Sequence, residues 1–98
     1  MAKEVVQLDF HLTPFRAERF VNAYRPAVPL VLEYGAKGYS FYRTDDDPDH
    51  FVHVSYWDDR KKFDHYWMSR EMRDIRRQIL GFHDHLLLPH YGAVLERA

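Results

Sequence analysis

The sequence predicts an α+β domain in which one four-stranded antiparallel sheet carries both helices on one face, the ferredoxin-like order βαββαβ. Two observations lead to this fold class. Apolar and polar residues alternate in four short segments, as they do in half-buried strands, and apolar residues recur at helical spacing in two of the regions between them. With 98 residues, the chain has room for one domain spanning residues 1–98.

The first strand and the first helix occupy the N-terminal third of the chain. Residues 5–12 alternate between apolar and mostly polar side chains and predict a strand. Thr13 is a good N-cap residue and Pro14 suits a first helical turn, so we expect a helix over about residues 14–25. Two prolines should interrupt it, leaving a further helical turn or two that ends near Gly35.

A β-hairpin is expected next. Residues 39–43 and 51–57 alternate as strands, and the acidic, proline-containing segment 45–49 predicts the turn between them. Asp58 or Asp59 should then cap a helix.

The C-terminal third predicts a helix that is interrupted once, followed by a strand. Ser69 is a second helix start, and a buried stripe continues from there to Gly81. Residues 91–95 predict the final strand. The resulting sheet has one face that no helix of the same chain covers, and we place Gln7, Asp9, His11 and His53 on it. A second copy of the chain would cover this face, which predicts a homodimer.

The composition excludes several classes of protein. The formal net charge is −1, so no global field attracts nucleic acid or an anionic membrane, and no apolar run reaches membrane-spanning length. Cysteine is absent, which excludes thiolate chemistry and thiolate metal sites. The four glycines match no nucleotide-binding motif, so we expect no cofactor. The N-terminus lacks the apolar core of a signal peptide, which favours a cytoplasmic protein.

Aromatic residues make up 16% of the chain, more than a core of this size needs. This excess favours an aromatic-lined cavity or a buried interface. We place a cavity between the helices and the sheet, at positions that combine inward-facing aromatic side chains with a few polar groups: Phe10, Asn22, Phe41, Val54, Tyr66 and Trp67. His53 belongs either to a polar active-site network or to a hydrogen-bonded dimer interface, and we favour the interface.

The segment from Ser55 to Ser69 carries a resemblance to a known family. Its strand ends at an aromatic pair and a helix follows at an aspartate, in the pattern Trp57, Asp59, Phe63, Tyr66 and Ser69. This pattern resembles the antibiotic biosynthesis monooxygenase family of dimeric α+β barrel proteins. Most of the chain follows that family in element order, and residues 55–69 follow it in motif.

The resemblance implies oxygen insertion without a prosthetic group, on a small aromatic or quinol-type substrate. Tyr66 and Trp67 would shape and hydrogen-bond the substrate, and either His53 or His83 would accept its proton. The family often has a histidine where Tyr66 stands here. A tyrosine is a poor base at neutral pH, so in this chain it is expected to donate hydrogen bonds instead.

Other interpretations of the same residues remain open. His83 and His85 form an H-x-H pair that could bind a metal, but a solvated loop is the commoner meaning, and we expect no metal site. The arginines of the last helix could hold an anionic substrate, but we favour pairing with Glu71 and Asp74 in solvent: Arg70, Arg73, Arg76 and Arg77. Related proteins that bind or degrade heme carry an asparagine on the first strand, where Gln7 stands here, and a histidine on the last helix, which residues 72–80 lack. A non-catalytic small-molecule-binding module is the third interpretation.

Overall fold

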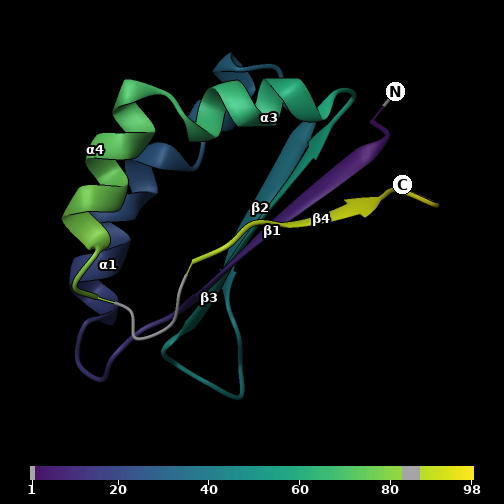
Figure 1. Ribbon diagram of the computed structural model, residues 1–98. Helices are drawn as coiled ribbons and strands as arrows, with labels where there is room; N and C mark the ends of the chain where they lie inside the picture. The colour runs from purple at the N-terminus through teal and green to yellow at the C-terminus, as the bar shows by residue number, and fades with distance from the viewer. Residues whose placement is uncertain (1, 83–86) are drawn as a thin grey trace.

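The computed structural model describes residues 2–82 and 87–98. Figure 1 shows the strands crossing the molecule together, with the helices gathered on one side of them. The elements follow the chain in the order β1 (Glu4–His11), α1 (Ala17–Tyr24), the 3-10 helix η1 (Arg25–Ala27), α2 (Leu30–Glu33), β2 (Gly38–Arg43), β3 (His50–Trp57), α3 (Arg60–Trp67), α4 (Arg70–Ile79) and β4 (His90–Ala93). The predicted order βαββαβ and the ferredoxin-like α+β fold class are confirmed.

The sheet has the spatial order β2-β3-β1-β4, and all neighbouring strands are antiparallel. In its register Leu8 lies opposite His53, and Phe10 lies opposite Phe51. Because side chains alternate along a strand, this register divides the sheet into two faces. The covered face packs against the helices and includes Val6, Leu8, Phe10, Tyr39, Phe41, Phe51, His53, Ser55 and Trp57. The open face is opposite and includes Gln7, Asp9, His11, Tyr42, His50, Val52, Val54 and Tyr56.

The placement of His53 on the open face is therefore wrong. His53 is buried on the covered face opposite Leu8, whereas Gln7 and Asp9 point to the other side. Val54, which we placed in the cavity between helices and sheet, lies opposite Gln7 on the open face. The bulky aromatic rings of β3 decide this orientation, because their burial against the helices removes more apolar surface than burial of its valines would.

The first helix begins later than predicted. Phe15 has a left-handed backbone (φ 68°), and Arg16, rather than Thr13, occupies the N-cap position of α1. The backbone amide of Thr13 donates instead to the Phe82 carbonyl at 2.9 Å, which ties the end of β1 to the end of α4. At the other end of this helical region, Gly35 follows α2 with φ 105°, a conformation that favours glycine.

Two helix starts were correctly predicted. The Asp59 side chain accepts a hydrogen bond from the Lys61 amide at 2.9 Å and caps α3. The Ser69 hydroxyl accepts from the Met72 amide at 3.2 Å and caps α4. Because both side chains satisfy amides that the helix leaves unpaired, α3 and α4 are separate helices that share one buried stripe.

The core is an aromatic layer between the covered face and the helices. Phe10 lies 4.9 Å from the Phe20 ring and 4.6 Å from the Tyr24 ring, measured between centroids. On the α3 side, Trp57, Phe63 and Tyr66 form a second fully buried cluster. Of the helices in the described part of the chain, none is long and apolar enough to cross a membrane.

Candidate functional site

A groove runs between α1 and the edge strand β2 and opens to solvent. Its volume is about 540 Å³, and its walls include Val21, Arg25, Tyr39, Phe41, Arg43 and Phe51. A neighbouring hollow shares Val21, Arg43 and Phe51 and extends the groove along α1 to Asn22. We call this continuous depression the α1–β2 groove. It combines aromatic walls with two guanidinium groups, and neither arginine forms an ion pair with another described residue.

His53 lies directly behind the groove. Its ring makes edge-on contacts with two groove residues, at centroid distances of 6.3 Å to Tyr39 and 6.0 Å to Phe41. Only 1% of His53 is exposed, so a molecule in the groove reaches its ring only if these two side chains turn aside. Burial lowers the pKa of His53 to about 4, which keeps the imidazole neutral at physiological pH.

A chain of buried hydroxyl groups connects His53 to the helices. The Tyr24 hydroxyl lies 2.6 Å from His53 Nδ1, and the Tyr66 hydroxyl donates to the Ala27 carbonyl at 3.0 Å. Tyr24 and Tyr66 also interact through their hydroxyls. Burial, together with the neighbouring Tyr66, raises the pKa of Tyr24 well above its usual range. Burial also raises the pKa of Tyr66, so both phenols stay protonated.

This chain favours one tautomer of His53. Since Tyr66 donates to Ala27, its oxygen is available to accept from Tyr24. Tyr24 then accepts from Nδ1–H of His53, and the lone pair of the ring lies on Nε2. His53 Nε2 is buried and has no hydrogen-bond partner among the described residues. Such an orphaned acceptor is unusual in a protein interior and marks a place where a ligand proton would be accepted.

Arg76 is a candidate site residue that the sequence interpretation missed. We expected it to be solvated, but its guanidinium lies over the Trp67 ring, 4.2 Å from the centroid, and donates to the Trp67 carbonyl. Its charge also acts on Tyr24 and Tyr66, which places a cation beside the hydroxyl chain. Helical spacing could have indicated this position, because Arg76 lies four residues after Met72 and three before Ile79, which are both buried in α4.

Of the six residues that we expected to line one cavity, four do not surround a common space: Phe10, Asn22, Phe41 and Val54. Phe10 is fully buried in the aromatic core, and Val54 lies on the open face. Phe41 and Asn22 both border the α1–β2 groove, one in each of its two parts. The structure thus brings two of the four to the same depression, which lies between α1 and the edge strand β2.

The predicted catalytic residues are also divided. Tyr66 and His53 belong to the same buried chain, and Trp67 lies beside it, half-buried under Arg76. His65, the neighbour of Tyr66 on α3, is exposed. His83, with the H-x-H pair it begins, lies outside the described residues.

The position of Gln7 argues against the heme interpretation, which would need a ligand-binding residue there on the first strand. Gln7 is exposed on the open face and donates to Asp9 Oδ2 at 2.9 Å. It therefore points away from the groove, from His53 and from the helices, and cannot contribute to a site on the covered face.

Comparison with known proteins identifies relatives of this arrangement. The sequence profile of the family described as antibiotic biosynthesis monooxygenase matches residues 5–78. A candidate antibiotic biosynthesis monooxygenase from Nitrosomonas europaea has a similar structure, with a TM-score of 0.86 at 16% identity over 95% of this chain and 99% of that one. A conserved protein from Methanosarcina mazei superimposes with a TM-score of 0.83 at 17% identity over 94% and 92%. No curated protein matches the sequence significantly.

Similar structures extend to a protein of unknown function. A conserved protein from Bacteroides thetaiotaomicron, described as a possible oxidoreductase, matches with a TM-score of 0.80 at 10% identity over 95% of this chain and 98% of that one. Identities this low establish the fold alone. The profile, in contrast, matches most of the sequence and includes the strand-to-helix segment with Trp57, Phe63 and Tyr66. The chain therefore belongs to the antibiotic biosynthesis monooxygenase family.

Proposed function

We propose that this protein is a cofactor-independent monooxygenase that oxidises a small aromatic or quinol-type substrate bound in the α1–β2 groove. The observation that carries the proposal is His53, a buried neutral imidazole whose Nε2 lacks a partner among the described residues and lies behind the aromatic wall of the groove. Family membership supports the type of reaction.

The reaction needs little from the protein beyond binding and proton transfer. A phenolic ring that loses its proton becomes electron-rich enough to pass an electron to dioxygen. One oxygen atom then enters the ring to give a quinone, and the other leaves as water, so no external reductant is consumed. His53 Nε2 accepts the phenolic proton, and the anion formed beside it raises the pKa of the imidazolium by charge attraction.

Arg25 and Arg43 in the groove, and the hydroxyl chain behind it, contribute to this chemistry. The two guanidinium groups favour a substrate that carries or develops negative charge. Tyr24 holds Nδ1 of His53, and Tyr66 holds Tyr24, so both act by positioning the base.

Oxygen uptake with a panel of phenols, naphthols and quinols tests the proposal, with the rate without protein subtracted. His53→Gln should lower kcat at least about 100-fold, because proton transfer by a positioned base contributes roughly 10² to 10⁴. Tyr66→Phe, which removes the hydroxyl that positions Tyr24, should lower it about tenfold to a thousandfold. The exposed His65→Ala should leave it unchanged, and the purified protein should show neither flavin nor heme absorbance.

Several results would decide against the proposal. Turnover that survives His53→Gln would show that His53 is not the base, stoichiometric flavin would show that a cofactor is used, and a Soret shift with added hemin would favour the heme-binding alternative. Binding of aromatic compounds without oxygen uptake across the whole panel would identify the chain as a non-catalytic binding module.

We also infer that the protein is a homodimer in which the open face covers the same face of a second copy. Val52, Val54 and Tyr56 give that face an apolar centre, and the described helices lie on the other side. Val54→Lys should shift the mass measured by light scattering from dimer to monomer, whereas Leu32→Lys on α2 should not. A monomer mass for the unsubstituted protein at micromolar concentration would contradict the inference.

A further inference from the structure

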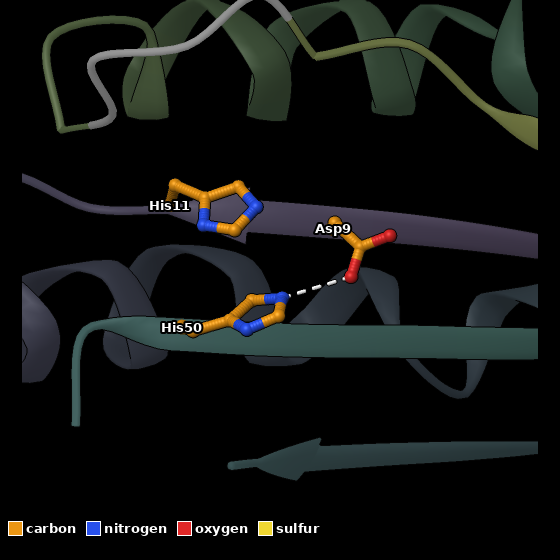
Figure 2. Close-up of side chains that lie close together, drawn as sticks. All are labelled: Asp9, His11 and His50. Carbon is orange, nitrogen blue, oxygen red and sulfur yellow. Dashed lines mark hydrogen bonds and ion pairs between the residues drawn. The ribbon is translucent and has the colours of Figure 1, made fainter. Parts of the chain in front are cut away.

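Three side chains at one end of the open face form a cluster that the proposed oxidation does not use. Asp9 and His11 lie two residues apart on β1, so they share a face, and His50 at the start of β3 lies directly opposite His11. One ligand atom from each residue lies within 4.8 Å of the others. Figure 2 shows the two imidazole rings one above the other, with the Asp9 carboxylate beside them.

We propose that Asp9, His11 and His50 bind a divalent transition-metal ion of the zinc type, at a site separate from the α1–β2 groove. Two imidazoles and one carboxylate are a ligand set that suits first-row divalent ions, with the remaining positions left to water or another ligand. The proposal does not depend on the oxidation, because the sheet lies between the two sites.

The geometry requires only a small adjustment of the side chains. Metal bonds of about 2.0 to 2.2 Å place ligand atoms about 3 to 4 Å apart. His50 Nε2 already lies 2.8 Å from Asp9 Oδ1, and the two imidazole rings are stacked with centroids 4.2 Å apart. Rotation of the imidazoles about their side-chain bonds would turn their lone pairs toward a common point. His11 is the last residue of β1 and His50 the first of β3, so the cluster lies at the end of the open face rather than at its apolar centre.

The surroundings also orient the carboxylate. Gln7 Nε2 donates to Asp9 Oδ2 at 2.9 Å, which leaves Oδ1 directed toward His50. A carboxylate held in place by a neighbouring amide is prepared for metal coordination.

The first experiment is calorimetric titration of the metal-free protein, prepared with a chelator and without a histidine tag, with Zn²⁺. We expect one ion per chain. His11→Ala, His50→Ala and Asp9→Asn should each weaken binding about 100-fold or more, because even loss of a group behind a ligand costs 10- to 100-fold. His65→Ala, which removes an exposed histidine of α3, should leave the affinity unchanged. Absence of binding to the parent protein would overturn the proposal, and so would an affinity in the three variants equal to that of the parent.

A second measurement uses the unsubstituted protein and so does not depend on whether the variants fold. Added Co²⁺ should shift or broaden the imidazole NMR resonances of His11 and His50 at the lowest metal concentration. If the resonances of any other histidine respond first, the metal binds elsewhere and the proposal is wrong. Circular dichroism of the variants, compared with the parent, separates loss of the site from loss of the fold.

Discussion

The two faces of the sheet use histidine in opposite ways. On the covered face, His53 is enclosed by aromatic rings, hydrogen-bonded to the Tyr24 hydroxyl and kept neutral by burial. On the open face, His50 is partly exposed and paired with a carboxylate at 2.8 Å. The two residues are three positions apart on β3, so the alternation of the strand alone separates them. Burial and the nearest partner, rather than residue type, decide which chemistry each imidazole supports.

The largest expected difference between the faces is in apolar burial. Phe10→Ala removes a fully buried ring that contacts Phe20 and Tyr24, and it should lower the free energy of unfolding by about 3 to 5 kcal/mol. Gln7→Ala on the same strand removes an exposed side chain and should change it by less than about 1 kcal/mol. Urea denaturation of both variants checks the comparison. Equal losses would mean that the open face is as tightly packed as the covered one.

The next effect is the pH dependence that His53 introduces. Its pKa is about 4 in the folded protein and about 6.5 when unfolded, so the unfolded state binds more protons between these values. Stability should therefore be complete above about pH 6.5 and fall by about 3 kcal/mol as the pH is lowered to about 4.

His53→Gln is the matched control for this pH dependence, because it retains a polar side chain that does not titrate. The free energies of unfolding of parent and variant should diverge as the pH is lowered from about 6.5 to about 4, because only the parent loses the stability that neutral His53 contributes. Parallel curves would mean that His53 is protonated in the folded protein or is not buried in solution.

The helix starts and the hairpin could be predicted because their signals are local. Asp59 and Ser69 cap α3 and α4 through amides only two or three residues away, and the acidic turn between β2 and β3 is continuous in sequence. Thr13 was predicted to cap α1 on the same kind of local signal, but that prediction was wrong. Its amide donates instead to the Phe82 carbonyl, which is distant in sequence.

The face assignment of β3 could not be read from the sequence. Both of its alternating sets are largely apolar, with Val52, Val54 and Tyr56 in one and Phe51 and Trp57 in the other. The choice depends on what packs above the strand, and an error of one residue reverses every side chain. The same register decides that His50 joins Asp9 and His11, a cluster that spacing along the chain does not indicate.

A smaller effect should follow from the hydrogen bond of the covered face. Tyr24→Phe removes the partner of His53 Nδ1 in a fully buried place, and an unsatisfied buried group costs about 1 to 3 kcal/mol. Chemical denaturation at pH 7.5 measures this loss. The NMR shifts of the His53 imidazole should change at the same time, because the hydroxyl that fixes its tautomer is gone. Unchanged shifts would show that Tyr24 does not control the tautomer.

The smallest effect should come from the polar pair of the open face. In the metal-free protein, Asp9→Asn replaces one partner of the Asp9–His50 pair by an amide of the same shape, and both partners are partly exposed. Pairs accessible to water contribute about 0 to 1 kcal/mol, because solvent compensates for the lost attraction. Urea denaturation in the presence of a chelator should therefore give a loss of less than about 1 kcal/mol, below that of Tyr24→Phe. A larger loss would mean that this pair, which includes the first residue of β3, is shielded from water in the folded protein.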